Sequence, residues 1–458
     1  MCGIVEFIGA MSVVMCVFFV TFCINNRVNL VRYRVKLLRC SFVVHLHFIV
    51  VMASSELNQL SARERAVSVR LALVFALRMF GLFVVLPVLA PYALTLPLGG
   101  GVVSTPEKMG MAIGLAMGAY GLTQAFLYIP YGLASDRFGR KPVITLGLLI
   151  FAAGSIWAAS AQTVYGLAAA RALQGAGAIS SVVVAMVADM TRDSVRTRAM
   201  AMIGMSIALT FAGSLVLGPL LFDRIGMSGI FLLIASLALV AIGLIWSIPL
   251  GKQGSAPITS AQAMRQVLSD SRQWLLNIGV FVLHAVQMAM WVVIPHQLLA
   301  LNVSHQQSTW LYLVVILISM ALMIPLIIRA EKYGKMFEIM RWAIALIALS
   351  QIVLILQSNV GAYWIAAALL LFFTGFNVLE ATQPSLLSKL THPATKGAAS
   401  GVYNTIQALG LFAGSMLGAW LNNHWQTRGV FVGTAVLALA WLVIHQRFYV
   451  NPPPRAVE

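Results

Sequence analysis

Four ionisable side chains lie inside long apolar stretches of the sequence: Glu380, His284, Arg78 and Arg171. A charge at the centre of a bilayer costs about 2.5–3.5 kcal/mol on insertion scales, so each of these residues is a candidate for function. A buried carboxylate with an imidazole beside it can take up and release protons. Glu380 and His284 lie at similar depths in their apolar runs, within about one helical turn. We therefore predict that they face one cavity, with Glu380 as the main proton-titrating group and His284 as its partner.

Simpler roles for these residues stay open. Glu380 could reach toward water from a helix end, and His284 could be an ordinary hydrogen-bonding residue between helices. Arg78 is expected to line a cavity or to pair with another group. The sequence does not identify that group, because the N-terminal half has no carboxylate in the middle of an apolar stretch.

A charged segment with the sequence GLASDRFGRK, residues 132–141, separates two apolar runs. Asp136 lies where the first run ends, Arg140 follows about one turn later, and Asp189 ends a later run. We hypothesise that these three residues latch the helix ends in an outward-facing state, and that Gly132 lets a neighbouring helix approach closely. The alternative is a set of solvated charges that only fixes topology. The other polar or glycine residues of the proposed latch are Arg137, Gly139 and Lys141.

The composition identifies the elements that must position these groups. Of the 458 residues, 60% are hydrophobic and 9% are charged, whereas a soluble domain carries about 25% charged residues. Runs of about 20 apolar residues span a bilayer as helices. We predict an all-α polytopic membrane protein with twelve spans: 69–92, 109–134, 142–161, 165–190, 198–222, 229–249, 274–301, 308–330, 337–357, 360–386, 397–421 and 428–447.

The loops between these spans alternate in charge. One set holds 20 Lys and Arg residues and the other holds three, Lys108, Arg224 and Arg428. Basic loops stay in the cytoplasm, so both termini are predicted to be cytoplasmic.

The chain divides into two halves around a polar stretch. We expect a six-helix bundle at 52–249, a cytoplasmic linker at 250–273, a second six-helix bundle at 274–447 and a cytoplasmic tail at 448–458. Residues 1–51 contain all four cysteines and differ in character from the rest. They are interpreted as upstream sequence attached by a wrong start codon, with an uncleaved anchor or a signal peptide as alternatives; mass spectrometry of the mature N-terminus distinguishes these cases.

Two short motifs recur about 200 residues apart, at equivalent places in the two halves. DRFGR at 136–140 is matched by EKYGK at 331–335, and FAGSLVLG at 211–218 by FAGSMLG at 412–418. Repeated halves are typical of transporters whose substrate site lies between the repeats near the midplane.

These motifs carry a family resemblance. The 132–141 segment resembles motif A of the major facilitator superfamily, and Arg171, Gln174 and Gly175 resemble its R-x-x-Q-G motif. Gly213, Gly218 and Pro219 are similar to the motif typical of antiporters, without the glycines that usually follow the proline. Residues 60–450 look most like the proton-driven drug-antiporter branch. Some members carry a soluble domain after the last helix; because this chain ends at Glu458 after a proline-rich tail, we expect none here.

The resemblance implies further roles. Arg171 is expected to influence proton release or to join helices by hydrogen bonds, and Gln174, Gly175, Gly213, Gly218 and Pro219 to serve helix packing or gating. Six polar residues fall on spans that line the cavity in this family, and we expect two or three of them to touch substrate: Tyr120, Gln124, Gln287, Asn377, Asn404 and Gln407.

The leading hypothesis is a proton-coupled exporter of amphipathic small molecules that works by alternating access. The alternative is a proton-coupled importer or exchanger of a metabolite such as a sugar or an organic anion. No catalytic constellation such as H-E-x-x-H or G-x-S-x-G is present, so an enzyme is not expected. The basic residues do not form the patch that nucleic acid requires. We expect no cofactor and no metal, and a monomer in the cell inner membrane whose partners are substrate, protons and lipids.

Overall fold

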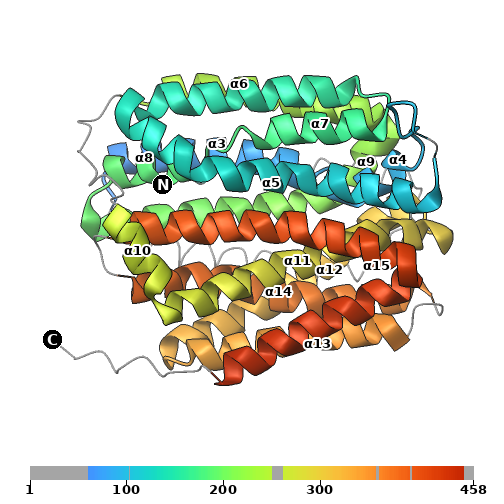
Figure 1. Ribbon diagram of the computed structural model, residues 1–458. Helices are drawn as coiled ribbons and strands as arrows, with labels where there is room; N and C mark the ends of the chain where they lie inside the picture. Colours follow the sequence, from blue (N-terminus) through green and yellow to red (C-terminus); the bar gives the residue numbers. More distant parts are fainter. Residues whose placement is uncertain (1–59, 103, 250–260, 357–360, 392–394, 448–458) are drawn as a thin grey trace, which may run out of the picture.

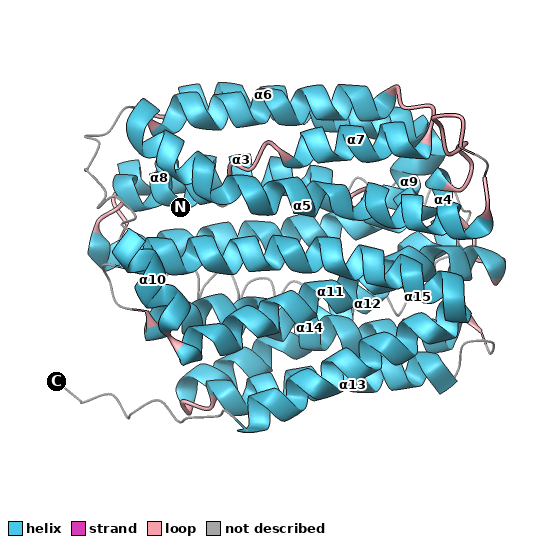
Figure 2. Ribbon diagram, viewed as in Figure 1, coloured by secondary structure: helices cyan, strands magenta, loops and turns pink. Residues whose placement is uncertain are grey.

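A computed structural model describes residues 60–102, 104–249, 261–356, 361–391 and 395–447. The predictions for residues 1–51, for the tail at 448–458 and for the first part of the linker, 250–260, concern segments outside these ranges. Within the described residues every regular element is a helix, as predicted (Figure 2).

The helices run roughly parallel in two groups, with the N-terminal half in blue to green and the C-terminal half in yellow to red (Figure 1). The first half contains α3 (Ala62–Phe83), α4 (Leu86–Ala93), α5 (Pro106–Phe138), α6 (Arg140–Ala159), α7 (Val164–Gly175), α8 (Ser180–Met190) and α9 (Asp193–Trp246). The second contains α11 (Ser271–Ala300), α12 (His305–Lys332), α13 (Met336–Leu356), α14 (Ala362–Leu390) and α15 (Lys396–Arg447). Between them α10 (Ala261–Ser269) occupies part of the predicted linker, and α11 begins three residues earlier than predicted.

Two helices each contain two of the predicted spans. The described residues hold ten helices that are long and apolar enough to cross a membrane. Of the elements within them, α9 has 54 residues and α15 has 52, which would make each roughly 80 Å long if straight, against a hydrocarbon core of about 30 Å. Each breaks midway, α9 at Gly226 and α15 at Trp425 and Gln426. The ten helices thus accommodate all twelve predicted spans.

Two predicted spans are interrupted, which the hydrophobicity pattern did not indicate. The predicted span 165–190 is divided into α7 and α8 by four residues, 176–179, and the predicted span 69–92 into α3 and α4 by Val84 and Val85. In the first case the end of α7 packs closely against α5: a Cβ at Gly175 would collide with the Tyr120 carbonyl and the Thr123 hydroxyl. Helix breaks at membrane depth require other groups to satisfy the freed backbone.

The two motif copies share backbone features. Gly139 (φ 92°) and Gly334 (φ 63°) both adopt the left-handed conformation that only glycine adopts freely. Gly218 lies against the Val84 carbonyl between α3 and α4, and Gly418 lies against Ala289 of α11. The first helix of each half is thus contacted by the fifth.

The two halves meet where α5 lies beside the first part of α15 (Figure 1). Four glycines on one face of α5, at 110, 114, 118 and 121, approach α15 so closely that a Cβ would meet Asn423, Ala419, Ser415 or Ala408. Nearer the Asp136 end of α5, which we call the motif end, a Cβ at Gly132 or at Gly401 of α15 would meet nothing within 4 Å. The halves are therefore closed at the opposite end and through the centre, and apart at the motif end.

Two of the glycines make no close contact in this conformation. No neighbouring helix approaches Gly132, which is predicted to belong to a latch of the outward-facing state, so that role stays a prediction. A Cβ at Gly213, expected to serve helix packing or gating, would also meet nothing within 4 Å.

Gly213 and Gly414 occupy the same place in the repeated FAGS sequence and provide a matched test. A Cβ at Gly414 would collide with the Ala285 backbone on α11. We predict that Gly414→Ala destabilises the protein by about 1–3 kcal/mol because α11 must move. Gly213→Ala should be neutral or stabilising by up to about 1 kcal/mol. Thermal unfolding of the purified variants measures both, and equal effects would contradict the packing described here.

Candidate functional site

Arg140 is the centre of a charge cluster at the motif end. Its Nη1 lies 2.5 Å from Asp136 Oδ1 and 2.6 Å from Ser135 Oγ, and its Nε lies 2.9 Å from Asp189 Oδ2. These side chains come from α5, α6 and α8, which all belong to the N-terminal half. In this conformation the cluster joins three helix ends of one half. Ser135, which the sequence did not single out, is its fourth member.

A second group of basic residues binds the C-terminal end of α9. Lys141 Nζ donates to the Ile248 carbonyl and lies 5.6 Å from the centre of the Trp246 ring. Arg70 Nη1 donates to the Ser247 carbonyl at 2.8 Å. The last carbonyls of a helix carry partial negative charge, so cations stabilise this end.

Glu64 is a site residue that sequence reasoning missed. Its side chain accepts from the backbone N–H of Arg192 at 3.1 Å and from the Arg192 guanidinium at two positions, both 2.9 Å. It also closes a capping box with Ser61 at the start of α3. The serine-x-x-glutamate pattern at 61–64 was the available signal. This pairing fixes the segment between α8 and α9 to the first helix.

Arg78 has partners in the break between α7 and α8. Its Nε lies 3.3 Å from the Gly177 carbonyl, and its Nη1 donates to Ser180 Oγ at 2.7 Å. Gln124 adds a third contact: in the amide orientation that satisfies its hydrogen bonds, its oxygen accepts from this guanidinium and from the Tyr128 hydroxyl. Arg78 therefore binds the segment between α7 and α8 through the Gly177 carbonyl, which also accepts from the Ile179 N–H at 2.9 Å.

Arg171 is fully buried and forms a separate network. It donates to Gln174 Oε1, and Gln174 Nε2 donates to Ser155 Oγ at 2.8 Å. Its guanidinium lies 4.9 Å from the centre of the Tyr120 ring. Its Nε and Nη2 are buried without a hydrogen-bond partner, as is the Tyr120 hydroxyl. Among the described residues, neither Arg171 nor Arg78 forms an ion pair with a carboxylate.

The structure brings Glu380, His284 and Gln407 together in the C-terminal half, from α14, α11 and α15. His284 Nε2 lies 3.5 Å from Glu380 Oε1 and 2.8 Å from Gln407 Nε2. On the other side of the ring, Nδ1 lies 3.0 Å from the Val280 carbonyl. Glu380 Oε1 is buried and lacks a hydrogen-bond partner. The predicted pair thus exists as a contact between helices.

The other polar residues predicted for the cavity are distributed among different contacts. Asn377 Nδ2 donates to Ser319 Oγ at 3.1 Å, joining α14 to α12. Asn404 is half-buried on α15. Gln287 is 1% exposed, and its Nε2 has no hydrogen-bond partner.

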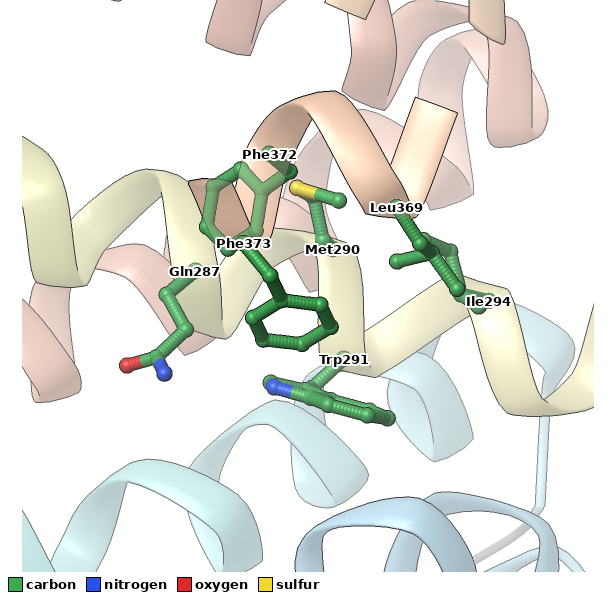
Figure 3. Close-up of a pocket in the computed structure, with 7 residues that line it drawn as sticks. All are labelled: Gln287, Met290, Trp291, Ile294, Leu369, Phe372 and Phe373. Carbon is green, nitrogen blue, oxygen red and sulfur yellow. The ribbon is translucent and has the colours of Figure 1, made fainter. Parts of the chain in front are cut away.

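Gln287 lines a narrow pocket whose other walls are apolar and largely aromatic (Figure 3). The lining residues of α11 and α14 are Gln287, Met290, Trp291, Ile294, Leu369, Phe372 and Phe373. The walls leave no room for a water molecule in this conformation. Phe211 of α9, from the other half, contacts this aromatic group: its ring centre lies 5.7 Å from that of Phe373 and 5.6 Å from that of Phe376.

Two polar contacts join the halves at the end opposite the motif end. His305 Nδ1 at the start of α12 lies 2.6 Å from Asp223 Oδ1 of α9, and the His305 ring packs edge-on against Phe222. Asn423 Nδ2 of α15 donates to the Glu107 carbonyl of α5 at 2.7 Å. These contacts lie at the α9–α12 and α5–α15 interfaces.

The sequence matches the Major Facilitator Superfamily over residues 71–415 and again over 276–458. The chain belongs to this family. It is accordingly a multi-pass membrane protein and a secondary transporter of small molecules, not an enzyme.

Relatives and solved structures agree with this assignment. The chain is 40% identical to the inner membrane transport protein YajR of Escherichia coli over 388 residues, which cover 83% of each protein. It is 25% identical to the multidrug resistance protein MdtH of Salmonella arizonae, over 74% of this chain and 88% of that one. The fold matches the xylose transporter XylE of E. coli in a partially occluded inward-open conformation, with a TM-score of 0.68 and 15% identity over 87% of this chain and 100% of that one.

The geometry of the Arg140 cluster predicts different transport rates when either of two nearby arginines, Arg140 or Arg137, is changed to lysine. Lysine cannot reproduce the two-sided contact of Arg140 with Asp136 and Asp189, because its ammonium is a single point charge. We expect Arg140→Lys to lower transport at least about tenfold, equivalent to one lost charged hydrogen bond, with normal membrane insertion. Arg137 was predicted to belong to the latch, but its guanidinium lies over the Phe138 ring at 5.4 Å, outside the described contacts of the Arg140 cluster. It is therefore the control, and Arg137→Lys should keep near-normal transport. Equal uptake rates for the two variants in vesicles would contradict a role for the cluster.

Proposed function

We propose that this transporter is a proton-coupled exporter of amphipathic small molecules. The observation that carries the proposal is the contact of Glu380 with His284, whose same ring nitrogen also meets Gln407, between three helices of the C-terminal half. A carboxylate inside an apolar bundle is retained where it serves transport or proton relay. The name of MdtH supports export of drug-like compounds.

The hydrogen-bond geometry explains how this group would exchange a proton. The Val280 carbonyl can only accept, so it orients a proton onto His284 Nδ1. His284 Nε2 then accepts from the Gln407 amide. This arrangement offers Glu380 Oε1 no donor. A proton that binds to Glu380 Oε1 would neutralise the carboxylate. When the proton leaves, the charged carboxylate again lies beside His284, whose two ring nitrogens already have hydrogen-bond partners.

The charge distribution and the interface together support an alternating-access mechanism. By the positive-inside rule, the basic loops favour a cytoplasmic position for the motif end and for both termini. The conformation described is then closed on the outer side, by the Asp223–His305 and Glu107–Asn423 contacts, and parted on the cytoplasmic side. Rocking of the bundle at 52–249 against that at 274–447 would break these contacts. The Arg140 cluster would then meet the other half and latch the outward-facing state.

A second candidate function is a proton-coupled importer or exchanger of an organic anion. The two buried guanidinium groups, Arg78 and Arg171, favour it because they place positive charge within the bundle. Inside-out vesicles with an imposed pH gradient distinguish the two: an acidic interior drives accumulation of substrate by an exporter, whereas an importer coupled by symport loses substrate.

Neutralising Glu380 tests the proton site. We expect Glu380→Gln to abolish transport driven by a pH gradient, at least about 100-fold as for other essential proton-transfer groups, while substrate still binds. Glu338→Gln, which removes only the exposed ion pair with Lys335, should leave transport intact. The measurement is proton flux accompanying substrate movement in proteoliposomes. Proton-coupled transport by Glu380→Gln would remove this assignment.

Bridging the outer contact tests the rocking motion. Asp223→Cys and His305→Cys are combined in a protein whose four native cysteines are changed to serine, and the pair is joined with a short thiol-specific cross-linker. We expect transport to stop when the pair is joined and to recover on cleavage of the linker, because the two halves can no longer separate. Each single variant with the same reagent is the control. Full transport by the cross-linked protein would show that this interface does not open.

A further inference from the structure

The pocket between α11 and α14 has two kinds of wall. One is aromatic and is formed by Trp291, Phe372 and Phe373. The other presents N–H donors: Gln287 and Trp291 lie one turn apart on α11, and Figure 3 shows their side-chain nitrogens on the same side of the Phe373 ring. A ring flanked by two donors on one face can recognise an aromatic group that carries an acceptor.

The unpartnered donor is the observation that points to a ligand. Gln287 is 1% exposed, and its Nε2 has no hydrogen-bond partner. A buried donor without an acceptor is costly, so native proteins retain one where a ligand or a function uses it. Trp291 is 3% exposed, and the only polar atom of its side chain is also a donor.

The pocket lies where the two halves meet. Phe211 of the N-terminal half packs against Phe373 and Phe376, and Phe83 packs edge-on against Phe211 with ring centres 4.9 Å apart. In this conformation an aromatic ring of the other half packs against Phe373 of the pocket wall, and the pocket leaves no room for a ligand. When the halves separate, the Phe211 contact opens, and an aromatic substrate can replace it.

The charged side chains buried within the bundle restrict the class of substrate further. Arg78 and Arg171 are 1% and 0% exposed, and among the described residues neither forms an ion pair with a carboxylate. Within the described residues, Glu380 of the C-terminal half contributes a carboxylate to the interior of the bundle. Two buried cations against one carboxylate disfavour a permanently cationic ligand, because charges interact strongly in a low dielectric.

We propose that Gln287, Trp291 and Phe373 form a substrate subsite for a planar aromatic group bearing a hydrogen-bond acceptor oxygen, such as a carbonyl or a carboxylate, in preference to an aromatic cation. This subsite rests on the proposed function, since it assigns the substrate class of the exporter. Phe373 contacts the ring, and the Gln287 amide and the Trp291 indole donate to the oxygen.

Two probes that share a naphthalene ring distinguish the contribution of the acceptor oxygen to binding from that of the ring. 1-Acetonaphthone carries a carbonyl, and trimethyl(1-naphthyl)ammonium carries a positive charge and no acceptor. Equilibrium binding of the tritiated compounds to the purified full-length protein in lipid nanodiscs should show at least about tenfold tighter binding of the ketone, as expected for one or two hydrogen bonds. Trp291→Phe, which keeps a ring and removes the N–H, and Gln287→Leu should each weaken ketone binding about five- to tenfold. Neither should change the weak binding of the ammonium.

Trp342→Phe is the matched control, because Trp342 is 60% exposed on α13 and should leave both affinities unchanged. Thermal unfolding verifies that each variant is folded, and Trp291→Phe remains informative if Gln287→Leu is unstable. The subsite is refuted if the ammonium binds as tightly as the ketone, if neither probe binds, or if both variants retain wild-type ketone affinity.

Transport of the same probes in vesicles tests the function separately. Ketone binding without movement driven by a pH gradient would refute proton-coupled export and leave the subsite standing. Proton-driven export of the ammonium in the absence of ketone binding would refute the subsite and leave proton-coupled export standing.

Discussion

Every backbone N–H and C=O at membrane depth must find a partner within the protein, because hydrocarbon offers none. This constraint explains why a charged side chain is buried at Arg78. In the break at residues 176–179 the Gly177 carbonyl accepts from the Ile179 N–H and from the guanidinium of Arg78, which also donates to Ser180 Oγ. The arginine thus adds hydrogen bonds to a segment that has fewer of its own than a continuous helix. The energetic cost of a charge in the bilayer suggests a functional role for Arg78. Its hydrogen bonds show that it also stabilises the segment between two helices of the N-terminal half.

The same constraint shapes the interface between the halves. Backbones can approach closely only where side chains are small or absent, and the glycine face of α5 allows α15 to do so from the end opposite the motif end to the centre. Beyond Gly121 the face loses this contact, and the halves part. The polar groups follow this division. The two described hydrogen-bonded contacts between the halves lie at the closed end, and the Arg140 cluster at the parted end is contained within one half.

The spans and the candidate site could be predicted to different extents. Spans follow from apolar length, and the breaks within α9 and α15 fall where the predicted loops lay, because Gly226 and the polar residues around Gln426 interrupt the apolar pattern. The contact of Glu380 with His284 could be predicted because the depth of each residue in the membrane follows from the number of helical turns before it. The break between α7 and α8 was not predicted, because the whole of 165–190 has the length and hydrophobicity of one span, although Gly175 and Gly177 were an available signal. Likewise, Phe211 looks like any core phenylalanine until its partner from the other half is known. The partners of Arg78 are a backbone carbonyl and two neutral side chains, whereas the sequence search was for a carboxylate.

The end of α9 has a mechanical consequence. Its last carbonyls are held by Arg70 from the first helix and by Lys141 from α6, while the Trp246 indole donates to Thr145 at 3.1 Å. Glu64 ties the opposite terminus of α9 to the same first helix through Arg192. Three helices are thus cross-braced at a single level, and a torque applied to one is passed to the others. We expect this half to behave as a stiff frame, with bending concentrated in the helices that lack such bracing.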